Sequence, residues 1–242
     1  MAKNKKWFAG ILGWTLGGPI GGMIGFALGT FLDSQSSSVN EYVKSSQGKS
    51  ANDFEMSLLV LSSIVIKADG KVQQSELDFV RNHFIKLFGK ERANLSFKMF
   101  NEMMKEEVSL QKVCTQIRQY MPHASRLQLI HFLFGLANAD GHVHETELRV
   151  IQTTANYFNI NLHDFESLKA MFFKSVDASY KILEIDTNVS DDELKKAYRK
   201  MAKKFHPDRV AHLGEALQGE ANEKFKKVQE AYESIRKERG IA

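Results

Sequence analysis

The chain has few of the residues that cross-link a fold or interrupt its helices. Its 242 residues include one cysteine, Cys114, and three prolines. A single cysteine excludes an intramolecular disulfide and any CxxC zinc site, and it fits a reducing compartment. Few prolines and few runs of Val, Thr and Tyr argue against an all-β fold. The net charge of +4 is too mild to indicate a nucleic-acid partner.

Charged residues are absent from residues 7–32, WFAGILGWTLGGPIGGMIGFALGTFL. A helix of this length rises roughly 39 Å, enough to cross a bilayer with some tilt. The competing interpretation is a cleaved signal peptide, which has an apolar core of about 7–15 residues and a small-residue cleavage site. The segment is longer than such a core and lacks that site. The sequence therefore predicts a membrane anchor over residues 1–32.

Eight of the 16 glycines lie in this apolar segment. Five of them are spaced by four and share one helical stripe: Gly13, Gly17, Gly21, Gly25 and Gly29. Small residues at this spacing let two membrane helices approach closely, so we expect self-association as a homodimer. Gly17, Gly18 and Pro19 leave two shapes open. They kink a single spanning helix, or they turn a re-entrant hairpin of two short arms.

The residues around the anchor raise a question of orientation. Lys3, Lys5 and Lys6 precede it, while Asp33 follows it. The positive-inside rule would place the N-terminus in the cytosol and everything after residue 33 outside. Residues 33–52 contain seven serines and little that could be buried, which predicts a flexible linker.

Residues 53–175 carry apolar residues at helical spacing, for example Leu58, Leu61 and Val65. No convincing strand alternation occurs there, so we predict an all-α fold. An internal repeat lies in this region. ADGKVQQSEL (68–77) and ADGHVHETEL (139–148) share six of ten positions at an offset of 71 residues. The repeat predicts two helical hairpins related by a pseudo-twofold axis.

Each copy of the repeat has the features of a turn that leads into a helix. Gly70 and Gly141 fit the left-handed position of a tight turn. Ser75 and Thr146 are the expected helix N-caps. We treat His142 and His144 as surface residues, because the first copy has other residue types at their positions.

The repeat also resembles the second half of a calcium loop, because each copy contains G-x5-E. An EF-hand needs oxygen ligands two and four residues before its first Asp, and these positions hold Lys67 and Val65 in the first copy. Neither loop can therefore coordinate calcium alone. Two interpretations stay open. Either each Asp stabilises its turn and each Glu favours a helix N-terminus, or one composite cation site is formed by Asp69, Glu76, Asp140 and Glu147.

Taken together, residues 53–175 resemble the TerB domain of tellurite-resistance and related proteins. The resemblance rests on the paired helix–ADGxVxxxEL–helix units within about 120 helical residues. It implies a helical bundle whose clustered acidic residues are proposed to bind metal. In this chain those residues would be the four acidic residues of the composite site.

A basic helix follows. Ser190 and Glu193 form the pattern of a capping box, so a helix is expected from about residue 191. Its apolar stripe is Leu194, Ala197, Tyr198, Met201 and Phe205, and its outward face is Lys195, Lys196, Arg199, Lys200 and Lys203. Pro207 ends it. A second long helix is expected over about 220–238, after a longer loop at 209–219, and a short helix at 178–183 covers the open side.

The tripeptide His206-Pro207-Asp208 at the end of the basic helix has three simple interpretations. A catalytic dyad lacks a nucleophile nearby. A nucleic-acid binder has the charge, but Asp208 ends the strip and no aromatic residues interleave it. A solvated basic face does not explain a rigid polar tripeptide. None of the three accounts for the whole pattern.

Residues 177–237 closely resemble a J-domain. The YxxLxx start, the capped KKAYRK helix, HPD and KFKxxxEAY occur in that order. The resemblance implies docking on a DnaK-type chaperone and stimulation of its ATPase, with electrostatic attraction to an acidic chaperone surface. The domain would be an activator, not an enzyme, with no catalytic residue of its own. The implied chaperone contacts are Lys195, Tyr198, Arg199, Lys200, His206, Pro207, Asp208 and Lys226.

The anchor, the TerB-like region and the J-domain (177–242) resemble, in this order, the DjlA family of bacterial membrane-anchored J-domain proteins. The chain departs from other J-proteins in having no Gly/Phe-rich or cysteine-rich region after residue 237. The resemblance implies a co-chaperone at the inner membrane, with the TerB-like region as adaptor and both domains in the cytosol. That placement conflicts with the positive-inside rule. The alternative is a metal-sensing envelope-stress protein of tellurite-resistance type.

Overall fold

The computed structural model describes residues 49–105, 107–141, 143–173 and 177–241, and no strand occurs in these ranges. The all-α prediction is confirmed there. The predicted anchor at 1–32, its dimer and its choice between span and hairpin lie outside the described residues, as does the linker up to residue 48. Within the described ranges, no helix has both the length and the apolar character needed to cross a membrane.

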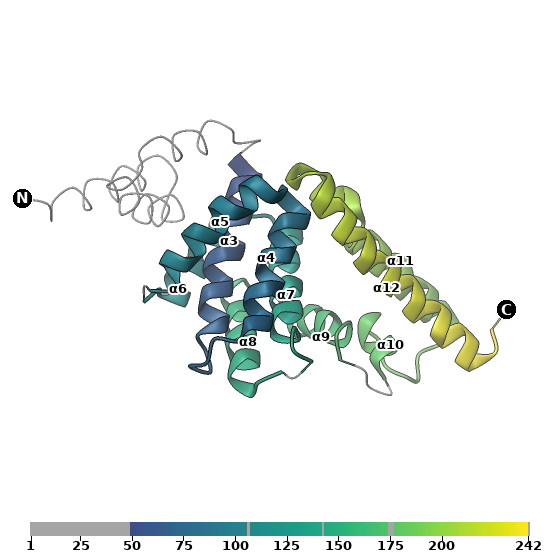
Figure 1. The fold of residues 1–242 in the computed structure, drawn as a ribbon. Helices are drawn as coiled ribbons and strands as arrows, with labels where there is room; N and C mark the ends of the chain where they lie inside the picture. Colours follow the sequence, from purple (N-terminus) through teal and green to yellow (C-terminus); the bar gives the residue numbers. More distant parts are fainter. Residues whose placement is uncertain (1–48, 106, 142, 174–176, 242) are drawn as a thin grey trace, which may run out of the picture.

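Seven helices form the N-terminal bundle (Figure 1). They are α3 (Lys49–Ile66), α4 (Gln74–Phe88), α5 (Lys90–Met103), α6 (Leu110–Tyr120), α7 (His123–Ala137), α8 (Glu145–Tyr157) and α9 (Leu162–Ala170). The first of these begins at Lys49, so residues 49–52, which the sequence placed in the linker, are helical. α7 packs against α3, α8 and α9. It is buried almost all round, as expected of a helix at the centre of a core.

The internal repeat forms two matching helix pairs, α3–α4 and α7–α8. Gly70 has φ 78° and Gly141 has φ 81°, so both occupy the predicted left-handed position. The predicted N-caps Ser75 and Thr146 are wrong. The N-caps are Gln73 and His144, because Glu76 and Glu147 reach back to their N–H groups and start each helix earlier.

The C-terminal hairpin comprises α10 (Ala178–Ile182), α11 (Asp191–Lys204), the 3-10 helix η1 (Pro207–Leu213) and α12 (Glu215–Arg239). The capping box predicted at Ser190 is confirmed, and α11 begins at the predicted residue. The second long helix begins at Glu215 instead of about 220, because Gly214, at φ 102°, turns the chain directly into it. The segment predicted as a long loop is therefore η1 and the first turn of α12.

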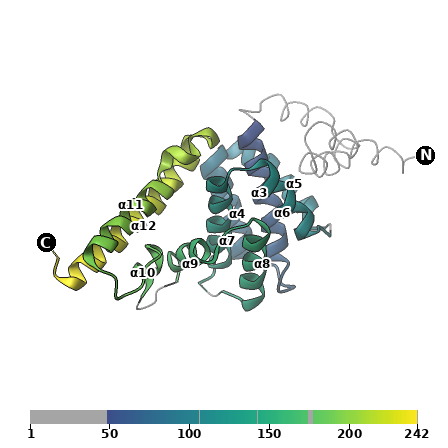
Figure 2. The same cartoon turned by 180° about the vertical axis from the view of Figure 1, so that it is seen from behind.

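The two parts pack against each other. α12 contacts α4, η1 contacts α3 and α7, and α10 contacts α9. Figures 1 and 2 show α11 and α12 as a long antiparallel pair at one side of the bundle. The buried Val210, Leu213 and Leu217 belong to one hydrophobic core together with the bundle.

Candidate functional site: the HPD corner and the basic helix

The tripeptide lies at the corner between α11 and η1. His206 is the N-cap of η1 and Pro207 is its first residue. The backbone N–H of Asp208 donates to Nδ1 of His206 over 3.3 Å. The side chains of His206 and Asp208 are 48% and 83% exposed. Proline at the first helical position fixes the local backbone, so two polar side chains are presented to solvent from a rigid turn.

The predicted contact residues on α11 divide into two groups. Lys195 and Arg199 are exposed and share the side of the helix that leads to His206. The Nζ atom of Lys200 lies 3.0 Å from the carboxylate of Glu184. Tyr198 is half-buried, and its ring stacks on that of Tyr232 with centroids 4.3 Å apart. Tyr198 therefore stabilises the hairpin and Lys200 forms an ion pair with Glu184, whereas Lys195 and Arg199 are exposed to a partner.

On α12 the predicted contact Lys226 is exposed. The preceding residue, Phe225, lies edge-on to His206 with ring centroids 6.0 Å apart. The structure thus brings α12 beside the tripeptide, although the two segments are about 20 residues apart in the chain.

The acidic repeat is used for turns and caps. Asp69 Oδ1 accepts the N–H of Lys71 at 2.9 Å. Glu76 and Glu147 accept the N–H groups of their N-cap residues at 2.8 and 2.9 Å. The turn-and-cap interpretation therefore holds for these three residues. Asp140 occupies the equivalent turn of the second copy.

Packing of the α3–α4 pair against the α7–α8 pair also brings the two glutamates together. Burial, together with the neighbouring Glu147 and Asp69 charges, raises the pKa of Glu76 to about 7, although the hydrogen bond from the Gln73 N–H opposes this effect. Burial raises the pKa of Glu147 as well. The two carboxyl groups lie within hydrogen-bonding reach of each other. His144, expected at the surface, is half-exposed, and its Nε2 lies 3.9 Å from Asp69.

Where the structure describes the chain, no group of three or more His, Cys, Asp or Glu side chains is arranged to hold a metal ion. The reason at the repeat is geometric. Glu76 and Glu147 direct oxygen atoms to backbone N–H groups and to each other.

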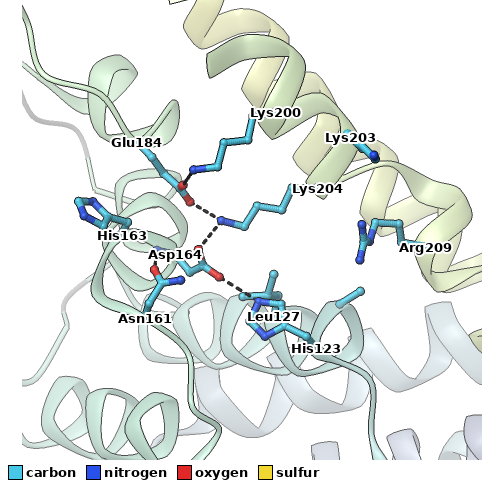
Figure 3. Close-up of a pocket in the computed structure, with 11 residues that line it drawn as sticks. His123, Leu127, Asn161, His163, Asp164, Glu184, Lys200, Lys203, Lys204 and Arg209 are labelled. Atoms are coloured by element: carbon cyan, nitrogen blue, oxygen red, sulfur yellow. Dashed lines mark hydrogen bonds and ion pairs between the residues drawn. The ribbon is translucent and has the colours of Figure 1, made fainter. Parts of the chain in front are cut away.

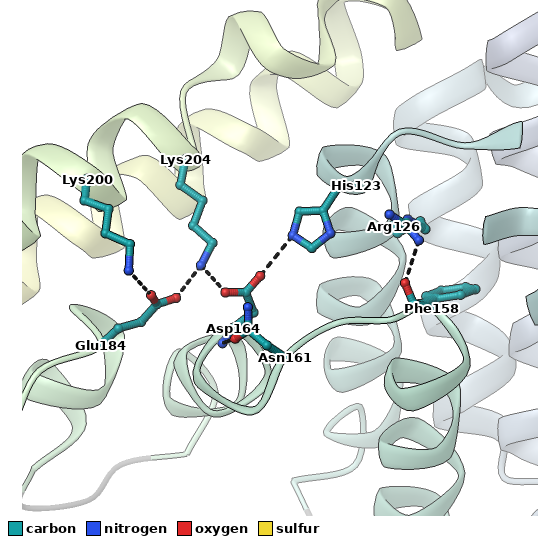
Figure 4. Close-up of polar contacts among 8 residues, drawn as sticks. All are labelled: His123, Arg126, Phe158, Asn161, Asp164, Glu184, Lys200 and Lys204. Carbon is teal, nitrogen blue, oxygen red and sulfur yellow. Dashed lines mark hydrogen bonds and ion pairs between the residues drawn. The ribbon is translucent and has the colours of Figure 1, made fainter. Parts of the chain in front are cut away.

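Sequence reasoning missed a polar junction between the bundle and the hairpin. A cavity of about 390 Å³ lies there, and its wall includes Lys203 and Arg209 from the hairpin (Figure 3). Lys204 of α11 bridges Asp164 on α9 and Glu184 (Figure 4). No local pattern predicts this bridge, because Lys204 and Asp164 are 40 residues apart.

Asp164 is the central acceptor of this junction. His123 at the start of α7 lies 2.9 Å from its second oxygen. Burial raises the pKa of Asp164, but hydrogen bonds from His123 and Lys204 outweigh burial and hold this pKa well below its ordinary value. The carboxylate is therefore ionised at neutral pH and links three helices, α7, α9 and α11.

Comparison with known proteins assigns each part of the chain. Residues 55–170 match the family described as tellurite resistance protein TerB, and residues 178–240 match the DnaJ domain. Residues 5–49 match the co-chaperone DjlA transmembrane domain, which supports the predicted membrane anchor. The N-terminal bundle is thus the TerB domain, and the C-terminal hairpin is the J-domain. No solved structure matches the chain.

Individual relatives agree with this assignment. The chain is 25% identical to co-chaperone protein DjlA of Vibrio vulnificus (strain CMCP6), over 81% of this chain and 82% of that protein. It is 48% identical to chaperone protein DnaJ of Fusobacterium nucleatum subsp. polymorphum over 56 residues, which span only 14% of that protein. By the content and order of its matched segments, the chain resembles the DjlA co-chaperones, with a segment that matches TerB between a segment that matches the DjlA transmembrane domain and a DnaJ domain.

Proposed function

We propose that the chain is a membrane-tethered co-chaperone whose J-domain recruits a DnaK-type chaperone and stimulates its ATPase. The observation that carries this proposal is the exposed pair of His206 and Asp208 on a rigid turn at the end of a basic helix. Lys195 and Arg199 supply positive charge on the same side, which favours fast, oriented docking on an acidic surface. The ATP chemistry belongs to the partner.

The other parts of the proposal concern the place of action. The TerB domain acts as an adaptor, and the segment at 7–32 anchors the protein in lipid and pairs with a second copy. The TerB domain and the J-domain lie on the cytosolic side of a bacterial inner membrane, because a DnaK-type partner needs ATP there. The basic strip serves the chaperone and does not bind nucleic acid.

The decisive variant is His206→Gln in the full chain. We expect stimulation of the chaperone's ATPase to fall to the basal rate. The midpoint of urea unfolding should change little, because the His206 side chain is half exposed and its hydrogen bond lies within its own turn. His163→Gln is the matched control, since it alters an exposed histidine of the TerB domain. Full stimulation by the His206 variant would overturn the J-domain proposal.

A divalent-cation sensor is the second candidate, and the convergence of Asp69, Glu76 and Glu147 favours it. A cation at this place has to displace the proton of Glu76, so its affinity should rise from about pH 6 to about pH 8. Calorimetric titration of the full chain with calcium tests this. Micromolar binding that is lost in Asp69→Asn/Asp140→Asn would support the sensor, whereas the absence of heat would leave turn and cap chemistry alone.

A further inference from the structure

A buried lysine lies between the TerB domain and the J-domain. Lys224 is on α12, and only 1% of its surface is exposed. Its Nζ atom lies 3.3 Å from Nδ1 of His131 on α7 of the TerB domain. A buried ammonium group without a partner is costly, so its burial requires matching groups at this place.

The matching groups come from three helices. His83 on α4 places Nε2 at 3.3 Å from Oε1 of Glu220, which is one helical turn before Lys224 on α12. His83 also packs on the ring of Phe132, with centroids 4.4 Å apart. We call these four residues the Lys224 cluster: His83, His131, Glu220 and Lys224.

Two more cations face the cluster. Lys86 lies on α4, and Lys227 on α12 donates to the carbonyl of Met171 at 3.0 Å. Burial and this nearby positive charge keep both histidines neutral. Burial, then Lys224 and Lys86, lower the pKa of His83 to about 3. Burial and the same lysine hold the pKa of His131 well below its ordinary value.

The neutral histidines make the contact specific. His131 accepts from the Lys224 ammonium through Nδ1, and Nε2 of His83 lies beside the Glu220 carboxylate without a hydrogen bond between them. Burial lowers the pKa of Lys224 to about 8, although Glu220 opposes this effect. Any rotation or sliding of α12 on α4 and α7 would leave buried charges unpaired, so the cluster permits one orientation of the J-domain.

That orientation separates the two sides of α11. Lys204 follows Lys195 by nine residues, which is about half a turn away around the helix. Lys204 faces Asp164 of the TerB domain, and Lys195 is exposed on the opposite side. His206 and Asp208 are also exposed. The docked TerB domain therefore covers none of these three chaperone contacts.

We propose that the Lys224 cluster holds the J-domain in one orientation on the TerB domain, with the HPD tripeptide and the Lys195–Arg199 strip turned to solvent, and that Lys224 is its positioning residue. The chaperone would then dock while the two domains remain packed together. The contact that orients the J-domain is inferred from the structure alone. The docking of a chaperone on the J-domain in this orientation rests on the function proposed above.

The test measures the distance between the two domains in the full chain. Spin labels are placed at Asn156→Cys on α8 and Ser234→Cys on α12, both exposed, with Cys114→Ser. At about pH 7.5 we expect one narrow distance distribution. Lys224→Ala should broaden it, because Glu220 loses its buried counter-charge, while Lys237→Ala on the exposed side of α12 should not. A narrow distribution in the Lys224 variant would overturn the proposal.

The pH dependence of the docking equilibrium distinguishes a positioning role of the Lys224 cluster from a role in packing alone. Opening lets His83 and His131 take up protons, so below about pH 6.5 the docking equilibrium should weaken by up to about a hundredfold per pH unit. In His131→Gln the glutamine side chain keeps a hydrogen-bond acceptor but does not titrate. The docking equilibrium should then weaken by only about tenfold per pH unit. An unchanged slope would contradict the role of the cluster even if Lys224→Ala fails to fold.

Adding a DnaK-type chaperone and ATP tests whether the chaperone binds while the J-domain stays packed on the TerB domain. We expect the distance distribution to stay narrow while ATP hydrolysis is stimulated. A broader distance distribution on chaperone binding would show that the domains must separate first. It would overturn the proposal that the chaperone docks on the J-domain in this orientation. If the wild-type chain gives no stimulation, the proposed function fails, while the distances without chaperone still report on the cluster.

Discussion

Glu76 and Glu147 occupy equivalent positions in the two copies of the repeat, each three residues after the N-cap of its helix. Each carboxylate accepts a backbone N–H, which is a local task. The fold then places the two side chains against each other, in a region with little solvent. Two buried carboxylates at short range cannot both be ionised at low cost, so the pair retains a proton near neutral pH.

This pair predicts a stability that falls as the pH rises. The pKa of Glu76 is about 7 in the folded chain and ordinarily 4.5. Its contribution is therefore complete below about pH 4.5 and is lost as the pH rises to about 7. Glu76→Gln keeps both hydrogen bonds without the charge and should raise the free energy of unfolding at about pH 8 by about 1–2 kcal/mol.

Urea denaturation at about pH 5 and about pH 8 checks this prediction. The control is Glu91→Gln, which removes an exposed charge from α5. A Glu76 variant with the same pH dependence as the wild type would show that the two carboxyl groups do not share a proton.

At the scale of elements, α11 is determined by its own ends. Ser190 Oγ accepts the N–H of Glu193 at 3.3 Å, and the Glu193 carboxylate accepts the N–H of Ser190 at 2.8 Å. Asp191 and Asp192 add negative charge at the positive end of the helix dipole. The helix ends at Lys204, shortly before Pro207. The element that carries the basic strip is therefore encoded by its local sequence.

The cap of α11 gives a prediction for this element. Ser190→Ala removes the acceptor for the Glu193 N–H and should lower the free energy of unfolding by about 1 kcal/mol, whereas Ser190→Asp should retain most of it. Urea denaturation of the full chain measures both variants. The interpretation of the cap would be wrong if alanine and aspartate had equal effects.

At the scale of the whole molecule, the TerB domain and the J-domain share a core and a buried polar junction. Both follow the segment that matches the DjlA transmembrane domain. Where they act depends on the side of the membrane on which this pair lies. By the positive-inside rule, the basic residues Lys3, Lys5 and Lys6 favour an external location for the two domains, whereas a DnaK-type partner requires them in the cytosol.

Thiol labelling decides the orientation. Single cysteines are placed by Ser37→Cys or Ala242→Cys in a Cys114→Ser background, and intact cells are treated with a membrane-impermeant reagent. We expect both sites to be protected until lysis. The basic N-terminus would then be overridden, or the anchor would be a hairpin. Labelling of both sites in intact cells would place the J-domain away from ATP and contradict the co-chaperone proposal.

The sequence by itself determined the helical class, the repeat with its Gly70 and Gly141 turns, the start of α11 and the HPD tripeptide. These features depend on residues within a few positions of one another, through helical periodicity, capping and backbone geometry. The start of α12 and the two N-caps were predicted wrongly. There, several local patterns compete and packing selects among them.

Tertiary structure alone decided which charged groups meet. Lys204 and Asp164 are 40 residues apart, and Lys224 and His131 are 93 apart. The contact between Glu76 and Glu147 exists only because the α3–α4 and α7–α8 pairs pack against each other. The energies of such contacts depend on burial and on the other charges nearby. Neither is known until the elements have packed, which is why a solvated lysine and a buried positioning lysine look alike in the sequence.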